Sequence, residues 1–458
     1  MIHSGGGLIS VETAAEFPVR LVESGPAGGA IFAADVARRF GLKKVVSYDM
    51  GGTTAKICLI EGFAPKTART FEVARTYRFA KGSGMPISIP VIEMIEIGAG
   101  GGSIAWVDAM GRIQTGPESA ASEPGPACYQ RDGLRPAITD ADLVLGKIDP
   151  DNFAGGAIRL SGAKAEAAIL RDVGARLNIA ATPAAFGICE VVDENMANAA
   201  RVHAVENGKN ISDNIMVAFG GAAPLHAARL CEKLGIDQCL IPAGAGVGSA
   251  IGFLKAPFGY EALASEITRL SGFVPEDVNA LLDELKSTAE GFVRAGTDGT
   301  IQREITAYMR YVGQGWEIPV ALPDRPFTTA DIAALRDSFQ QNYARFFGRA
   351  IDGLDGLEIE IVTFSVKAQD IRPAPDRHEL TLGRTEVDAS LSRTVFDPAR
   401  GETLPTGIVE RSGLIPGARV SGPAVVVERE TSTVVTSPFD VVMQGDGSLL
   451  LVRKEARE

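Results

Sequence analysis

The sequence predicts an α/β protein that ends in a small β module, and three observations point to this fold class. Residues 1–260 alternate short β-branched runs with alanine-rich stretches and glycine-rich connections, which is typical of an α/β domain. After Tyr260 the glycine clusters thin out and a second composition begins. Short apolar runs separated by Gly and Pro turns then fill the last part of the chain. We therefore predict an α/β domain at 1–260, an α/β segment at 261–372 and a β module at 385–458.

The elements of the first domain follow from runs of apolar residues. Strands are predicted at 44–48, 56–60, 216–219 and 238–241, and helices at 30–40, 163–177, 183–206 and 225–234. The clearest helix is 183–206, because Pro183 suits a first helical position and Asn207-Gly208 supplies a stop. Its apolar residues recur every three or four positions, so one face should pack on a sheet.

The elements of the C-terminal half are a helix at 274–295, a strand at 303–311 and the strands of the β module. A linker at 371–376 divides the two parts, because its prolines cannot join a helix or a central strand. The β module is predicted from valine-rich and leucine-rich runs at 424–428, 433–436 and 448–452.

Composition and charge exclude several classes of protein. The 458 residues carry a formal net charge of −12, from 57 acidic and 45 basic side chains, with no basic cluster suited to a phosphate backbone, so a nucleic-acid partner is not expected. No window approaches ~18 consecutive apolar residues, and the first residues lack the pattern of an export signal. We expect no membrane partner and a soluble, cytoplasmic protein. The five cysteines are scattered without a CxxC pair, which predicts reduced thiols.

The sharpest local signal is the segment from Asp49 to Lys56, which reads DMGGTTAK. Two adjacent glycines, Gly51 and Gly52, let a hairpin turn present backbone N–H groups without a Cβ in the way, and Thr53 and Thr54 add hydroxyl donors. This pattern indicates a phosphate cradle. Asp49, at the mouth of this turn, is the candidate catalytic and metal-binding residue. Its carboxylate would hold a water of a magnesium ion that bridges the phosphate oxygens. The alternative is a plain hairpin turn capped by Asp49.

Two further glycine clusters adjoin predicted helices. Ser24 to Gly29 precedes the helix at 30–40 and could bind an anion, although close packing of the helix is the slightly favoured interpretation. In the segment 219–226, Gly220, Gly221 and Ala222 leave room for a flat ring or a ribose between strand and helix. His226 is a catalytic candidate whose pKa the helix dipole should depress, leaving it neutral. A structural hydrogen-bonding role is the commoner alternative for such a histidine.

Other candidates carry weaker signals. The clusters 98–103 and 244–249 resemble dinucleotide loops, but neither spells GxGxxG, and the Walker form is absent from the sequence, which disfavours Rossmann and P-loop enzymes. Glu96, close to Glu93, could serve as a base if it pointed into a cleft, although solvated charge is the commoner explanation. Glu123 and Cys128 occupy a proline-rich loop that could line a site.

Taken together, these strings resemble the hydantoinase A / 5-oxoprolinase family. The likeness rests on six segments in the family's order: Ser24–Gly29, Asp49–Lys56, Glu96–Ser103, Glu123–Tyr129, Thr139–Gly146 and Ala218–His226. Residues 310–315 and 422–433 extend it into the C-terminal region. The resemblance implies an actin-like ATPase (ribonuclease H-like) lobe, with Asp49, Gly51, Gly52, Thr53 and Thr54 as a phosphate hairpin and Gly220, Gly221 and Ala222 near the adenosine.

The resemblance also implies an activity and partners. It indicates an A-type subunit that uses ATP and magnesium to open cyclic amides such as hydantoins or 5-oxoproline, paired with a hydantoinase B-type subunit. Alternatives are a subunit of an acetone- or acetophenone-type carboxylase, or a non-catalytic assembly subunit. Relatives carry a further N-terminal lobe with its own GGT hairpin, whereas this sequence has one such hairpin, so we expect a separate or missing lobe and self-association. Lys56 replaces an acidic residue that many relatives have.

Overall fold

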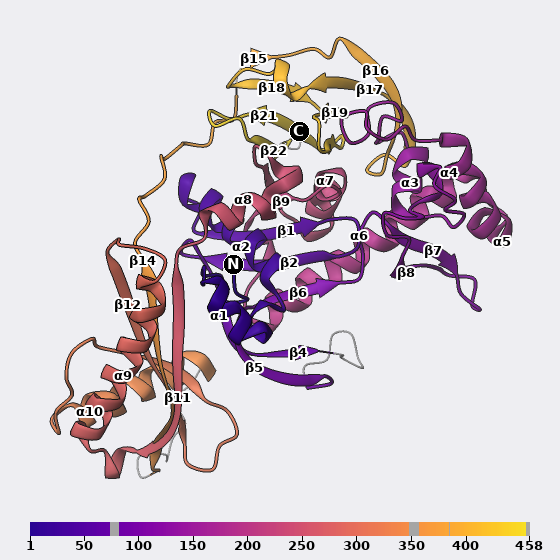
Figure 1. The fold of residues 1–458 in the computed structure, drawn as a ribbon. Coiled ribbons are helices and arrows are strands. Elements are labelled where there is room, and N and C mark those ends of the chain that lie inside the picture. Colours follow the sequence, from indigo (N-terminus) through magenta and orange to yellow (C-terminus); the bar gives the residue numbers. More distant parts are fainter. Residues whose placement is uncertain (74–81, 348–356, 384, 455–458) are drawn as a thin grey trace. The chain divides into compact units, whose positions relative to one another are not determined.

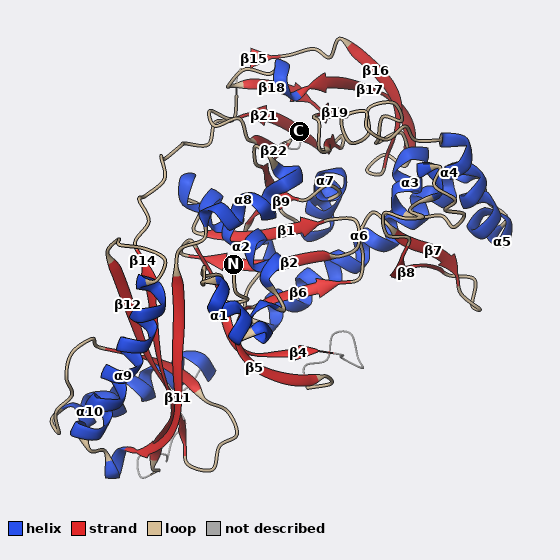
Figure 2. Ribbon diagram, in the orientation of Figure 1, coloured by secondary structure: helices blue, strands red, loops and turns tan. Residues whose placement is uncertain are grey.

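The computed structural model describes residues 1–73, 82–347, 357–383 and 385–454. The described residues form two compact units (Figures 1 and 2). The large unit comprises residues 25–255 and 375–458, and the small unit comprises residues 1–24 and 256–374. This division differs from the predicted boundaries, because residues 1–24 join the segment that begins at residue 256. No helix of the described residues is long and apolar enough to cross a membrane.

A mixed sheet organises the large unit. Its strand order is β15-β18-β21-β22-β10-β9-β1-β2-β3, and β6 also pairs with β2. β1 runs parallel to β9 and antiparallel to β2, and β10 runs parallel to β9. The strands with their bounds are β1 (Lys44–Met50), β2 (Ala55–Glu61), β3 (Ala64–Pro65), β6 (Met94–Ile97), β9 (Ile215–Phe219), β10 (Gln238–Ile241), β15 (Thr385–Glu386), β18 (Ala418–Ser421), β21 (Phe439–Met443) and β22 (Leu449–Arg453).

Two helices of the large unit, α6 (Ala181–Glu206) and α7 (Ala223–Leu234), pack on the central strands of this sheet (Figure 2). The large unit also contains α2 (Ser24–Arg39), α3 (Ile138–Val144), α4 (Gly162–Ile169), α5 (Ala175–Leu177) and α8 (Gly248–Lys255), of which α3 and α4 pack against α6. The predicted helices at 183–206 and 225–234 are confirmed as α6 and α7. The predicted helix at 163–177 is interrupted by a π-helical turn at 170–174.

Hairpins and a second sheet complete the large unit. The hairpins pair β4 (Thr67–Val73) with β5 (Met85–Ile92) and β7 (Ser103–Val107) with β8 (Ile113–Ser119). The second sheet has the order β16 (Leu391–Asp397), β17 (Glu402–Glu410), β19 (Ala424–Val427) and β20 (Ser432–Val435).

The strands of the predicted β module are real, but they divide between the two sheets. β19 and β20 lie in the second sheet, whereas β22 pairs antiparallel with β10 of the main sheet. The reason is the apolar run Leu449–Leu451, which is fully buried once β22 joins β10. The C-terminal residues thus form the second sheet and also extend the main sheet through β22.

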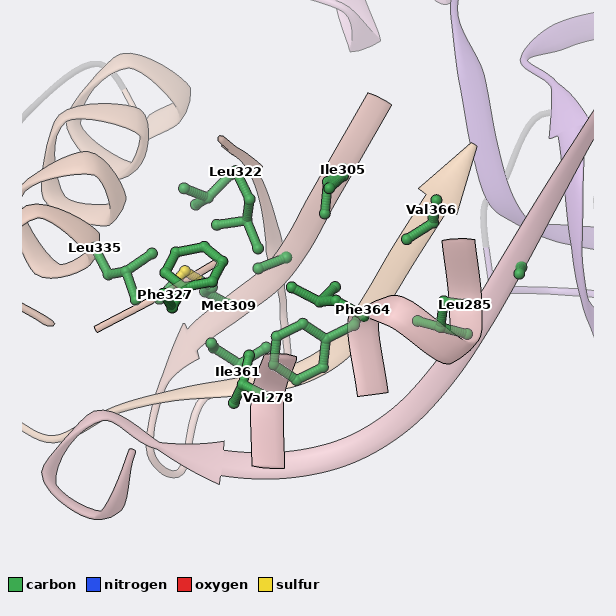
Figure 3. Close-up of a cluster of buried hydrophobic side chains, with 14 of the residues drawn as sticks. Val278, Leu285, Ile305, Met309, Leu322, Phe327, Leu335, Ile361, Phe364 and Val366 are labelled. Atoms are coloured by element: carbon green, nitrogen blue, oxygen red, sulfur yellow. The ribbon is translucent and has the colours of Figure 1, made fainter. Parts of the chain in front are cut away.

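The small unit packs helices on an antiparallel sheet. The sheet order is β11 (Gly259–Arg269), β14 (Ile359–Asp370), β12 (Ile301–Tyr311) and β13 (Ile318–Leu322), and the helices are α1 (Val11–Glu16), α9 (Pro275–Arg294) and α10 (Asp331–Phe347). Figure 3 shows the core, in which Val278 and Leu285 of α9 and Leu335 of α10 meet Met309 and Phe364 of the sheet. The predicted helix at 274–295 and strand at 303–311 are confirmed as α9 and β12.

Candidate functional site

The predicted hairpin exists and its tip faces solvent. β1 and β2 pair antiparallel up to Met50 and Ala55, and the Gly51 amide donates to the Thr54 carbonyl oxygen at 3.1 Å. Within the described residues, no hydrogen bond uses the amides of Gly52 or Thr53. In the same part of the chain, no atom lies within 4 Å of the place where a Cβ would stand on Gly51 or Gly52. The turn therefore leaves two amides without a protein partner, and open space lies beside Gly51 and Gly52, as an anion site requires.

The glycine cluster at 98–102 braces this hairpin. The amides of Gly101 and Gly102 donate to the carbonyl oxygens of Gly51 and Gly52 at 3.0 and 2.7 Å. A Cβ on Gly100 would stand only 2.5 Å from the Thr53 nitrogen, so the close approach needs glycine there. The cluster that resembles a dinucleotide loop in sequence thus positions the turn from outside.

Asp49 lies beneath the hairpin, between elements that are distant in sequence. Its Oδ2 accepts a hydrogen bond from Ser249 Oγ at 2.8 Å, and Cβ atoms built on Gly29 and Gly220 would approach its carboxylate oxygens to 2.9 and 2.7 Å. Burial raises the pKa of Asp49, while the Ser249 hydroxyl and the charge of Lys56 act in the opposite direction. The sequence did not predict the contact between Ser249 and Asp49. Ser249 is the last residue of the glycine cluster at 244–249.

The glycines that begin α2 serve close packing. A Cβ on Gly28 would stand 2.2 Å from the Phe253 ring, and one on Gly252 would stand 1.8 Å from the Gly28 carbonyl oxygen. α2 begins at Ser24, so Ser24 to Gly29 form its first turns and do not precede it. The packing interpretation of this cluster therefore accounts for its composition, and it brings Gly29 beside Asp49.

The loop after β9 lies against the hairpin. Gly220 has a φ of +95°, which favours glycine, and its amide donates to the Ala245 carbonyl oxygen at 2.8 Å. The Ala222 amide donates to the Met50 carbonyl oxygen at 3.0 Å, so it has no proton left for a ligand. The exposed Gly221 accepts from Thr431 Oγ1 at 2.9 Å. The structure thus places Gly220, Gly221 and Ala222 beside the strand that carries Asp49.

His226 is buried among charged side chains. Its Nδ1 lies 2.8 Å from Asp193 Oδ1 and its Nε2 lies 3.2 Å from Asp142 Oδ2, and Lys147 Nζ donates to Asp142 Oδ1 at 2.8 Å. Cys189 Sγ also donates to Asp142 Oδ1, at 3.4 Å. We call these five residues the buried charge network. It joins α3, α6 and α7 below the glycine loops.

The predicted protonation state of His226 is wrong. Burial alone would lower its pKa, and Lys147 acts in the same direction, but the carboxylates of Asp142 and Asp193 outweigh both and raise the pKa to about 9. A helix dipole corresponds to about half a charge and cannot offset two carboxylates at hydrogen-bond distance. The ring is therefore a buried cation, and within the described residues it has no exposed edge.

The weaker candidates do not gather at the hairpin as a set. Glu123 is 82% exposed, with Arg131 3.9 Å away, and burial raises the pKa of the Cys128 thiol well above its usual range. Glu93 forms an ion pair with Lys66 at 3.0 Å. Glu96 alone lies near the turn, 3.5 Å from Lys56 Nζ. All five cysteines are buried free thiols in the described part of the chain.

The residues present fit a phosphate better than a protein-held metal. The described residues contain no group of three or more His, Cys, Asp or Glu side chains that could hold a metal ion. Asp49, near the end of β1 and before the turn, supplies one buried carboxylate. Such a site suits magnesium that keeps most of its waters and arrives bound to phosphate oxygens.

Comparison with known proteins identifies the family. A family model for hydantoinase/oxoprolinase matches residues 1–262, and a model for the hydantoinase/oxoprolinase C-terminal domain matches residues 274–454. The chain belongs to the hydantoinase/oxoprolinase family. The fold described above is the hydantoinase-type, actin-like ATPase fold of its structural relatives.

Several members of the hydantoinase/oxoprolinase family are similar over long stretches. The alpha subunit of caprolactamase from Pseudomonas jessenii is 32% identical over 441 residues, which cover 94% of this chain and 62% of the relative. The gamma subunit of acetophenone carboxylase from Aromatoleum aromaticum is 39% identical over 254 residues, which cover 55% of this chain and 33% of the relative. The nucleotide-free structure of ATP-dependent acetone carboxylase has a TM-score of 0.79 and 25% identity, covering 99% of this chain and 64% of that one. The chain thus spans less than two thirds of the length of these relatives.

Proposed function

We propose that this chain binds ATP through the hairpin at 51–54 and serves as an A-type subunit in the ring-opening hydrolysis of a cyclic amide. The observation that carries the proposal is the pair of unused amides, Gly52 and Thr53, in the turn that follows Asp49 and its buried carboxylate. Backbone donors fixed in advance stabilise developing phosphate charge without reorganisation. Gly51 and Thr54 complete the proposed cradle.

The chemistry explains why a hydrolase of this kind uses ATP. A lactam carbonyl is a poor electrophile. Transfer of the terminal phosphoryl group from ATP to the amide oxygen forms an O–P bond and releases ADP. A first water then adds to the activated carbon and the C–N bond breaks, which gives an amine and an acyl phosphate. A second water hydrolyses the acyl phosphate to the acid and inorganic phosphate. In this scheme the hairpin amides bind the transferred phosphate, and magnesium, when bound, neutralises phosphate charge near Asp49.

The other proposed residues have supporting roles. Gly220, Gly221 and Ala222 offer a small-residue surface where an adenosine could lie without a large side chain in the way. We assign His226 a positioning role, because its ring is enclosed by Asp142 and Asp193. Both curated relatives described above are named as subunits, which supports a partner of the hydantoinase B type and a further lobe that completes the nucleotide site.

A second candidate is the activation of a ketone for carboxylation. It is supported by the 39% identity to the acetophenone carboxylase gamma subunit, although this match covers 254 residues. The match to the caprolactamase subunit covers 441 residues at the lower identity of 32%. The same phosphate hairpin would serve both reactions, since phosphoryl transfer to an enolate oxygen resembles transfer to an amide oxygen.

Turnover assays separate the candidates. The chain, alone and with its candidate partners, would be incubated with Mg-ATP and either hydantoin, 5-oxoproline and caprolactam, or acetone and acetophenone with bicarbonate. ADP release that depends on a cyclic amide and yields the ring-opened product supports the hydrolase. ADP release that depends on ketone and bicarbonate supports the carboxylase. Binding of Mg-ATP at millimolar concentration would be measured by calorimetry for the chain alone and with each partner. If no combination releases heat, the result supports a non-catalytic assembly subunit.

A further inference from the structure

A row of charged side chains crosses the sheet at the base of the hairpin. Lys56 of β2 lies directly opposite Asp49 of β1 and directly opposite Glu96 of β6. Residues that face each other across antiparallel strands present their side chains on the same face of the sheet. A lysine flanked by two carboxylates therefore lies on one face, two residues after Thr54 of the hairpin turn.

The ammonium of Lys56 is directed at the turn. Its Nζ donates to Thr54 Oγ1 at 2.6 Å, and Glu96 Oε1 lies 3.5 Å away. The second distance exceeds that of a good hydrogen bond, so the contact with Glu96 is an ion pair only. The Glu96 side chain is 46% exposed and that of Lys56 is 21% exposed, so solvent weakens this pair.

Donors remain on both side chains. An ammonium carries three N–H donors, and within the described residues Lys56 makes no other hydrogen bond or ion pair. Thr54 Oγ1 acts as the acceptor in its contact with Lys56, so its own O–H proton is available to a ligand. These groups adjoin the free amides of Gly52 and Thr53. A cation, a hydroxyl donor and backbone donors are the groups that bind a phosphate oxygen.

We propose that Lys56 binds the terminal phosphate of a nucleoside triphosphate at this hairpin, with Glu96 holding the ammonium in place while no anion is bound. The inference rests on the proposed function and names a residue and a phosphate within it. A doubly charged phosphate oxygen group attracts the ammonium more strongly than one solvated carboxylate at 3.5 Å. Thr54 stays bonded to Lys56 and orients it.

The test is calorimetry on the full chain with Mg-ATP, Mg-ADP and AMP. Lys56→Met should weaken ATP binding about 10- to 100-fold, which is the loss of one charge-assisted hydrogen bond, with a smaller effect on ADP and none on AMP. Lys66→Met is the matched control, because Lys66 forms a comparable ion pair with Glu93 at 3.0 Å. Lys66→Met should leave the affinity for all three nucleotides unchanged.

Two more variants separate binding from a structural effect. Lys56→Arg should recover part of the ATP affinity, since it keeps the charge. Glu96→Gln should leave ATP affinity equal or higher, because it removes a competitor for the ammonium. The role of Lys56 is overturned if Lys56→Met binds ATP like wild type, if it loses ATP, ADP and AMP equally, or if Glu96→Gln lowers ATP affinity as Lys56→Met does. Absence of nucleotide binding by the wild-type protein with its partners overturns the proposed function itself, and this role with it.

Discussion

His226 Nε2 lies 3.2 Å from Asp142 Oδ2, with the two side chains 0% and 1% exposed. Asp142 is shared, because Lys147 Nζ lies 2.8 Å from its other oxygen. Burial opposes charge at Asp142, Lys147 and His226, and their mutual contacts offset it. Asp142 belongs to α3, whose Thr139 donates to the Gly101 carbonyl oxygen at 2.8 Å, and His226 lies in the first turn of α7, which begins at Ala223 after the loop at 220–222. The pair therefore ties together the two segments that contact the hairpin.

Stability should depend on pH through His226. Its pKa is about 9 in the folded protein against an ordinary 6.5, so the protonated ring stabilises the fold fully below pH 6.5, and this contribution is lost as the pH rises to 9. The change is about 3 kcal/mol in the free energy of unfolding. Urea denaturation from pH 6 to 9.5 would measure it. His226→Gln should lack this slope, whereas His378→Gln should keep it. Parallel curves for wild type and His226→Gln would contradict the prediction.

Removal of the Lys147 ammonium should be strongly destabilising. Lys147→Met leaves Asp142 as a buried carboxylate with one cationic partner fewer, so we expect a loss of about 3 to 5 kcal/mol in the free energy of unfolding. The double variant Lys147→Met with Asp142→Asn should recover part of that loss, because it removes the uncompensated charge. Denaturant titration of the single and double variants measures both effects. A double variant less stable than Lys147→Met would show that charge compensation is not the cause.

Local signals predicted most of the fold, and pairing between distant segments accounts for the differences. The periodicity of apolar residues was sufficient for α6 and α9, because each helix buries one face. It could not place β22 beside β10, since strand partners leave no trace in a single sequence. The same applies to residues 1–24, whose backbone pairs with the start of β11: the Gly259 amide donates to the Leu8 carbonyl oxygen at 3.3 Å.

The candidate site shows the same division between local and distant information. The turn at 51–54 could be predicted from the sequence, because its glycines and threonines are consecutive. The contact of Ser249 with Asp49 and the buried charge network could not be predicted, since their members come from separate segments. In the network, Asp142, Cys189, Asp193 and His226 belong to three helices. The predicted direction of the His226 pKa shift was wrong for the same reason. The helix dipole can be inferred from the local sequence, whereas Asp142 and Asp193 come from other helices.

Asp49→Asn should separate activity from stability. Burial raises the pKa of Asp49, so the ionised carboxylate costs the folded state free energy, and asparagine keeps an oxygen that can accept from Ser249. We expect the free energy of unfolding to be unchanged or higher by up to about 1 kcal/mol, with ATP turnover lower by about 100-fold. Thermal denaturation and ADP release measure the two effects. Asp213→Asn, at an exposed aspartate, is the control. A destabilised Asp49→Asn with normal turnover would assign Asp49 to structure.

Gly100→Ala tests whether the brace shapes the hairpin. The new methyl group would stand 2.5 Å from the Thr53 nitrogen and 2.6 Å from the Gly52 carbonyl carbon, and backbone cannot move aside as a flexible side chain can. We expect a loss of about 1 to 3 kcal/mol in the free energy of unfolding and weaker Mg-ATP binding. Gly162→Ala is the matched control, because within the described residues no atom lies within 4 Å of its Cβ position. Denaturant titration and calorimetry on both variants give the comparison. Unchanged ATP affinity in a destabilised Gly100→Ala would mean that the turn keeps its donors without the brace.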